Sequence, residues 1–138
     1  MFHHILVPID FTEKSMAGVE VAMEHARRFG ARLTLLHVIE ELELITEQES
    51  KSFYRRLENQ AKARMLEFVK KIPSEGIEIQ HRLAFGHRAQ MIVHSAEEVE
   101  ADLIILSSHR IDPENAQGWG TISYRVALLS SCSVLLVK

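Results

Sequence analysis

Five short apolar runs alternate with four longer stretches of helical periodicity, and this alternation limits the possible fold more than any other feature of the sequence. Strands that alternate with helices usually pair in parallel, because each helix returns the chain across the sheet by a right-handed crossover. The sequence therefore predicts an α/β fold, a doubly wound, five-stranded and mostly parallel sheet with helices on both faces. The expected strands lie at residues 3–9, 32–38, 77–84, 101–108 and 132–138.

The segments between these runs carry apolar residues at the three- or four-residue spacing of a helix. The first helix is expected to begin at Thr12 or Ser15, because either hydroxyl can accept a free backbone N–H of the first turn. The acidic segment 40–49 has no clear period and predicts a loop with a helical extension. A third helix is expected at about residues 88 to 100, where Arg88 and three glutamates predict an exposed face.

The chain has 138 residues, enough for one domain, and we expect residues 1–138 to form a single domain. Its 16 basic and 19 acidic side chains leave a net charge of -3, which argues against nucleic-acid binding, since phosphate contacts need a basic surface. No apolar stretch approaches the roughly 20 residues that cross a bilayer. A strand follows Met1 within five residues, so no signal peptide is expected and a cytoplasmic location is predicted.

Two of the expected strands end in unusual polar sequences, Pro8-Ile9-Asp10 and Ser107-Ser108-His109-Arg110. In doubly wound sheets, ligands bind beyond the carboxyl ends of the strands, where the strand order reverses. If the first and fourth strands are neighbours, the two loops face one cleft, and the end of the second strand at Val38 forms its wall. The sequence therefore places a binding site there.

The residue types at this edge suit the parts of a nucleotide. Asp10 is an acceptor with the reach to bind a pair of ribose hydroxyls. Backbone groups around Val38, with the apolar faces of Pro8 and Ile9, can frame a flat base. Gly120-Thr121 opens the fourth helix, whose first N–H groups and dipole favour an anion.

Simpler interpretations of these residues remain open. Asp10 can act only as a capping acceptor before Thr12, and His109 with Arg110 can be solvated loop residues. Adjacent serine and histidine residues rarely have the geometry of a nucleophile and its base, so we expect no dedicated enzyme, although slow ATP hydrolysis remains open. Eight histidines are present without ligand spacing, and no dedicated metal site is expected.

Three segments resemble the universal stress protein family: VPIDFTEKS (7–15), ADLIILSSHR (101–110) and GTISYRVALLSSCSVLLVK (120–138). The nucleotide-binding members of that family carry Gly, two residues, Gly, nine residues, and then Gly-Ser or Gly-Thr. This chain keeps the spacing, with Ser107 and Arg110 in place of the first two glycines and Gly120-Thr121 at the end. If the second position needs a positive φ, Arg110 costs about 1–3 kcal/mol there, which a charge-assisted bond to phosphate would offset.

The resemblance implies a Rossmann-like, cytoplasmic stress-response protein that binds ATP or AMP between the first and fourth strands, with Mg²⁺ carried in by a triphosphate. It assigns Asp10 to the ribose and the Val38 backbone to adenine. Ser107, Arg110 and Gly120-Thr121 would hold the phosphates. The full expected nucleotide-binding set comprises Pro8, Ile9, Asp10, Val38, Leu106, Ser107, Ser108, His109, Arg110, Gly120, Thr121 and Ile122.

The resemblance also implies a homodimer, formed through the final strand at residues 133–138, and a regulatory protein partner of unknown identity. Nucleotide occupancy would alter a partner surface that includes the acidic segment 40–52. The alternative from another class is a nucleotide-free dimeric adaptor in which residues 107–119 form a protein-docking loop. A weaker third hypothesis is a hydrolase or nucleotidyl-transfer enzyme of similar fold.

Overall fold

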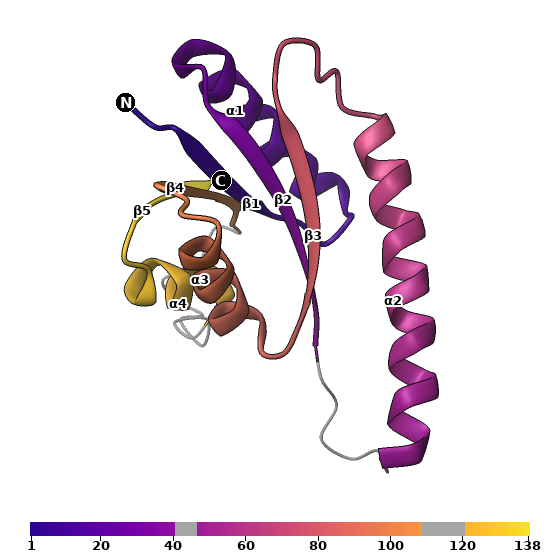
Figure 1. Cartoon of the computed structure of the whole chain (residues 1–138). Coiled ribbons are helices and arrows are strands. Elements are labelled where there is room, and N and C mark those ends of the chain that lie inside the picture. The colour runs from indigo at the N-terminus through magenta and orange to yellow at the C-terminus, as the bar shows by residue number, and fades with distance from the viewer. Residues whose placement is uncertain (41–46, 109–120) are drawn as a thin grey trace.

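The computed structural model describes residues 1–40, 47–108 and 121–138, and of residues 47 and 48 only the backbone. Strands and helices alternate along the described chain as the apolar pattern predicts (Figure 1). Their bounds are β1 (His4–Pro8), α1 (Glu13–Phe29), β2 (Arg32–Ile39), α2 (Glu47–Lys70), β3 (Ile79–Phe85), α3 (Arg88–Glu98), β4 (Leu103–Ser107), α4 (Ile122–Leu129) and β5 (Ser133–Val137).

The five described strands form one sheet in the order β3-β2-β1-β4-β5, and the four pairings between them are all parallel. The register pairs Leu6 of β1 with Thr34 on one side and with Ile104 on the other. The chain therefore winds outward in one direction from β1 and then in the other from β4. This confirms the predicted fold class, and the reversal of strand order falls between β1 and β4.

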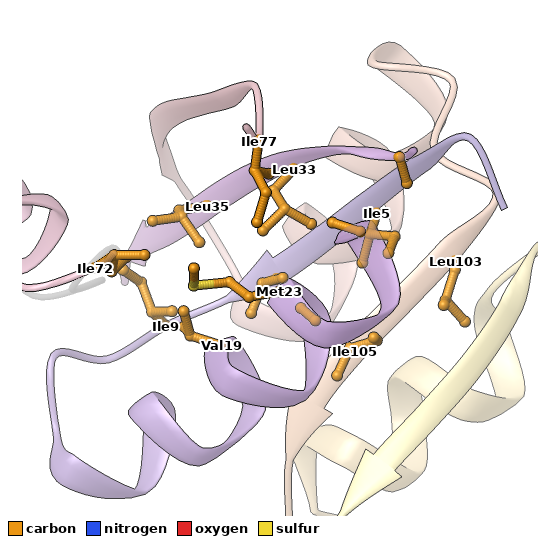
Figure 2. Packing of buried hydrophobic residues seen from close by; sticks show 14 of the residues in the cluster. Ile5, Ile9, Val19, Met23, Leu33, Leu35, Ile72, Ile77, Leu103 and Ile105 are labelled. Atoms are coloured by element: carbon orange, nitrogen blue, oxygen red, sulfur yellow. The ribbon is translucent and has the colours of Figure 1, made fainter. Parts of the chain in front are cut away.

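Two apolar layers cover the two faces of the sheet. On one face, α1 and α2 pack Val19, Met23 and Met65 against β1 and β2, as Figure 2 shows for much of this cluster. On the other face, α3 and α4 bury Ile92 and Val126 against the sheet. Each fully buried side chain of this size contributes about 1.5–3 kcal/mol, so both layers hold the strand ends in place.

The helix boundaries follow local chemistry, and α2 includes the helical extension expected within residues 40–49. Thr12 caps α1 by accepting the Ser15 N–H at 3.4 Å, while Gly30 ends that helix in the left-handed conformation at φ 67°. The described part of α2 begins at Glu47, several residues before its apolar stripe starts at Phe53. Among the described residues, no helix has both the length and the apolar character that a membrane crossing would need.

Candidate functional site

A pocket of about 670 Å³ lies over the carboxyl ends of β1, β2 and β4. Its lining is more apolar than polar, with Leu36, Val38 and Leu106 from the strands and Ile92 from α3. Polar side chains come from the first turns of α1 and α4. The lining residues are Pro8, Ile9, Asp10, Thr12, Lys14, Ser15, Leu36, Val38, Arg88, Ile92, Leu106, Ser107, Ser108, Thr121, Ile122 and Ser123.

The nine predicted residues that the structure describes all line this one pocket. They come from the ends of β1, β2 and β4 and from the start of α4. The expectation that the first and fourth strands are neighbours is confirmed, and their described ends line one pocket with the end of the second strand; the binding role of these residues stays a prediction. His109, Arg110 and Gly120 lie outside the described residues, as do residues 41–46 of the acidic segment.

Asp10 binds the first turn of α1 through one carboxylate oxygen. Its Oδ1 accepts the Thr12 N–H at 3.1 Å and the Ser15 hydroxyl at 2.5 Å, and the Thr12 hydroxyl also donates to it. The Ser15 Oγ in turn accepts the Asp10 backbone N–H at 2.9 Å. Among the described residues no hydrogen bond reaches Oδ2, so Asp10 anchors the helix and still offers an acceptor to the pocket.

These contacts decide the charge state of Asp10. Partial burial raises the pKa of this carboxyl. The hydrogen bonds from Ser15 and Thr12 lower the pKa, the positive charge of Arg88 also lowers it, and together they outweigh the effect of burial. The net effect places the pKa of Asp10 below its ordinary value. Asp10 is therefore an anionic acceptor at neutral pH.

Phe11 follows Asp10 with a left-handed backbone, φ 66°, which is costly for a residue with a β-carbon. Its ring packs against His37 with centroids 4.3 Å apart, and Arg64 of α2 lies 4.9 Å from the ring centroid. The His37 Nδ1 donates to the Ile9 carbonyl at 2.8 Å. Burial and the nearby Arg88 and Arg64 lower the pKa of His37, despite its bond to Ile9. The neutral His37 imidazole thus stabilises the strained turn by its hydrogen bond to Ile9 and its packing against the Phe11 ring.

The two serines at the end of β4 have different surroundings. The Ser108 hydroxyl lies 3.0 Å from the Ser123 hydroxyl of α4, and its backbone N–H bonds to the Val137 carbonyl at 2.8 Å. The Ser107 hydroxyl instead donates to the Lys14 carbonyl of α1 and accepts the Gly18 N–H. This differs from the expectation that Ser107 presents its hydroxyl to a phosphate, because α1 passes directly beside the end of β4.

The start of α4 forms the opposite wall of the pocket. Thr121 caps the helix by accepting the Tyr124 N–H at 3.4 Å. The N–H groups of the next two residues, Ile122 and Ser123, belong to the first turn, where a helix has no internal acceptors for them. Both residues line the pocket, so these donors and the positive end of the helix dipole lie at its edge.

Two cationic residues of the pocket were not among the predicted site residues. Lys14 belongs to the first turn of α1, and Arg88 is the first residue of α3, where its guanidinium lies 3.7 Å from the Glu40 carboxylate. Arg88 was expected only on an exposed helix face; its side chain is 40% exposed, and it also lines the pocket. In a parallel sheet every helix that follows a strand begins at the carboxyl edge, so the position of Arg88 just after the third strand was the signal.

Metal-ligand types do not gather in the described residues. No group of three or more His, Cys, Asp or Glu side chains there is arranged to hold a metal ion. The pocket instead combines one anionic acceptor, two cations, helix N–H donors and an apolar floor. That set suits a flat organic group that carries hydroxyls and negative charge.

Comparison with known proteins agrees with this architecture. The solved universal stress protein UspA of Lactobacillus plantarum superposes with a TM-score of 0.79 at 23% identity, covering 99% of this chain and 97% of that one. The solved protein MJ0577 of Methanocaldococcus jannaschii superposes with a TM-score of 0.77 at 30% identity, covering 100% and 96%. Universal stress protein YxiE of Bacillus subtilis is 28% identical over the full length of both chains.

Two further solved universal stress proteins share the fold. One is a complex with cAMP, with a TM-score of 0.69 at 20% identity, and covers 99% of this chain and 97% of that one. The other, from Archaeoglobus fulgidus, is a complex with dAMP, with a TM-score of 0.71 at 21% identity, and covers 99% and 98%. The model of the universal stress protein family matches residues 1–138, and the chain therefore belongs to the universal stress protein family.

Proposed function

We propose that this protein is a regulatory protein that binds an adenine nucleotide, ATP or AMP, in the pocket between β1 and β4. The observation that carries the proposal is the convergence of the Asp10 carboxylate, the end of β2 and the first turn of α4 on one cavity. Its volume of about 670 Å³ lies in the range of roughly 300–1,000 Å³ that small-molecule sites occupy. Proteins of this fold have been solved with cAMP and dAMP, so the fold can accommodate such a ligand.

The end of β2 supports adenine as the base. The pairing with β1 ends where the Ile9 N–H bonds to the Leu36 carbonyl at 2.8 Å, so the backbone groups of Leu36 point toward β1. Because backbone groups alternate sides along a strand, those of Val38 point the same way, beyond the last β1 bond. One N–H and one C=O there match the acceptor N1 and the donor N6 of adenine.

The remaining groups suit the ribose and the phosphates. Asp10 Oδ2 would accept a ribose hydroxyl, while Oδ1 stays bound to α1. The first N–H groups of α4, with Thr121, would hold a phosphate, and Lys14 and Arg88 add positive charge near the cavity. His109, Arg110 and Gly120 keep their proposed role at the phosphates. A bound triphosphate would bring Mg²⁺ with it, since the ion prefers phosphate oxygens and water.

A thermal-shift titration with ATP, AMP and GTP tests this function. At a hundredfold excess over its dissociation constant, the correct ligand should stabilise the protein by about 2.7 kcal/mol. Asp10→Ala should abolish the shift, whereas Glu20→Ala, at an exposed position of α1, should retain it. Mass spectrometry of the denatured protein should detect co-purified ATP or AMP.

The same experiment separates the other hypotheses. No shift with any nucleotide and no co-purified ligand would refute nucleotide binding and favour the nucleotide-free adaptor. Sustained ATP turnover that a single substitution abolishes would make the protein an enzyme. We propose that it is not one, because the Ser107 hydroxyl is bound to the Lys14 carbonyl and the Gly18 N–H of α1.

We further propose a homodimer formed through β5, in a protein that acts in the cytoplasm in stress regulation through a partner protein. Among the described strands β5 pairs only with β4, so its other edge is open. Leu128 and Leu129, on the last turn of α4 beside this edge, are 67% and 57% exposed. An apolar edge of this kind needs covering, and a second copy would cover it.

A further inference from the structure

The hydroxyl of Ser107 contacts the hydrogen-bonding groups of one turn of α1. In a regular helix the Gly18 N–H would donate to the Lys14 carbonyl, four residues earlier. Here the Ser107 Oγ accepts the Gly18 N–H at 3.1 Å and donates to the Lys14 carbonyl at 2.5 Å. A side chain of β4 therefore bridges both ends of one turn of α1, using its single donor and one of its two acceptor sites.

Gly18 is the residue that permits this approach. A β-carbon at position 18 would lie 2.9 Å from the Ser107 Oγ and 3.3 Å from the Ser107 N. Such contacts are too close without a shift, and the second involves the backbone of β4. The absence of a side chain at Gly18 of α1 thus leaves the space that the Ser107 hydroxyl of β4 occupies.

The bridged turn of α1 is also the turn that holds Asp10. Ser15, next to Lys14, exchanges hydrogen bonds with Asp10 through its hydroxyl, and Thr12 donates to the same carboxylate oxygen. The β1 and β4 strands pair directly, with Leu6 beside Ile104. A closed path therefore runs from β1 through Asp10 and the first turns of α1 to Ser107, and back through the sheet.

We infer that Ser107 is a positioning residue: it fixes the first turns of α1 against β4 and so holds Asp10 in place, rather than contacting the nucleotide itself. The inference rests on the proposed function for its effect on ligand affinity. The placement of Asp10, however, is measurable in the free protein, which separates the two claims.

The first test measures the pKa of Asp10 by carboxyl ¹³C NMR in the nucleotide-free protein. Burial raises this pKa and the Ser15 and Thr12 hydrogen bonds lower it, so loosening α1 should move it back up. Ser107→Ala should therefore raise the pKa of Asp10 relative to wild type. Ser130→Ala is the matched control, because Ser130 also bonds a backbone carbonyl, that of Cys132, but lies outside the pocket lining. An unchanged pKa in folded Ser107→Ala would overturn the inference.

The second test uses Gly18, whose substitution perturbs the bridge from the helix side. Gly18→Ala should weaken nucleotide binding about tenfold, of the order that one or two lost hydrogen bonds cost. Adding Ser107→Gly should leave affinity about as low as in Gly18→Ala, because both substitutions disrupt the same bridge between α1 and β4. If Ser107 contacted phosphate directly, Gly18→Ala would bind normally, and Ser107→Gly would add a further loss of affinity.

The pKa of Asp10 and the nucleotide affinity test the positioning role and the proposed function separately. If wild type binds no adenine nucleotide, the proposed function fails, and the pKa of Asp10 in Ser107→Ala still decides the positioning role. Should Ser107→Ala fail to fold, Gly18→Ala carries the test, because it disrupts the bridge from the helix side and should raise the pKa of Asp10 relative to wild type. Identical pKa values in wild type and Gly18→Ala would refute the bridge.

Discussion

Asp10 shows how one residue serves both structure and binding. Its Oδ1 accepts three hydrogen bonds from Thr12 and Ser15, which satisfies donors at the start of α1, and Oδ2 is left for the pocket. The capping interpretation and the binding interpretation of Asp10 are therefore compatible. The sequence placed Asp10 at a strand end, but only folding shows that its two oxygens face different neighbours.

The lowered pKa of Asp10 predicts a pH-dependent cost for Asp10→Asn. The pKa of Asp10 in the folded protein lies below the ordinary 3.8, so in acid the unfolded chain binds more protons than the folded protein. The stability that the Asp10 carboxylate contributes is therefore complete above 3.8 and is lost as the pH falls through the folded pKa. Asp10→Asn should thus be less stable than wild type at pH 7, with the gap closing in acid. Urea unfolding at pH 7, 5 and 3 checks this. The control Glu75→Gln, at an exposed turn, should show no such convergence, and a constant gap for Asp10→Asn would contradict the prediction.

At the scale of elements, the loop between β1 and α1 contacts α2 through the side chain of Phe11. Phe11 is held in the left-handed region, and its ring contacts His37 of β2 and lies 6.0 Å from the Phe68 ring of α2. These contacts compensate for backbone strain next to the binding pocket. A left-handed phenylalanine is not predictable from periodicity, because the aromatic partners come from elements far away in the sequence.

Replacing Phe11 separates its ring contacts from its backbone strain. Phe11→Ala and Phe11→Gly both remove the ring, but glycine adopts the positive φ without a β-carbon clash. Phe11→Gly should therefore be about 1 kcal/mol more stable than Phe11→Ala by chemical denaturation. On the exposed face of α1 the order should reverse, with Ala17→Gly losing about 1 kcal/mol. A Phe11→Ala variant at least as stable as Phe11→Gly would show that position 11 carries no such strain.

The elements also show where prediction from the sequence ends. Strand bounds were predicted to within two residues, because buried parallel strands are continuous apolar runs. Arg88 was assigned to an exposed helix face with the glutamates of the same helix, since the charge pattern of a helix does not show which edge of the sheet the helix begins at. The pairing of Ser107 with Gly18 spans 89 residues and leaves no local pattern.

At the scale of the whole molecule, the open edge at β5 leads to a prediction about assembly. Wild type should be a dimer by light scattering at micromolar concentration, since two apolar residues beside that edge are exposed. Leu128→Glu/Leu129→Glu should give a folded monomer, because buried charges oppose the interface. Leu66→Glu, 54% exposed on α2, is the control and should remain dimeric. A monomeric wild type, or equal dissociation by Leu66→Glu, would contradict the β5 dimer.

The single-domain proposal belongs to the same scale. One continuous sheet joins all the described strands, and each apolar layer contains residues from at least two helices. Both layers pack on the same strands, so loss of either layer would expose one apolar face of the whole sheet. We therefore expect one cooperative unfolding transition, with fluorescence and circular dichroism changing together.

By itself, the sequence determined the fold class and the edge of the sheet at which a site is expected, while the pairing of β1 with β4 was a condition that the structure meets. These follow from hydrophobic periodicity and from the handedness of crossovers, both of which are local properties of the chain. Only the tertiary structure decided the partners of individual polar groups: the Ser107 hydroxyl on α1, Oδ1 of Asp10 on Thr12 and Ser15, and Arg88 beside Glu40. These partners depend on which elements lie within hydrogen-bonding distance, and that is settled only when the layers pack.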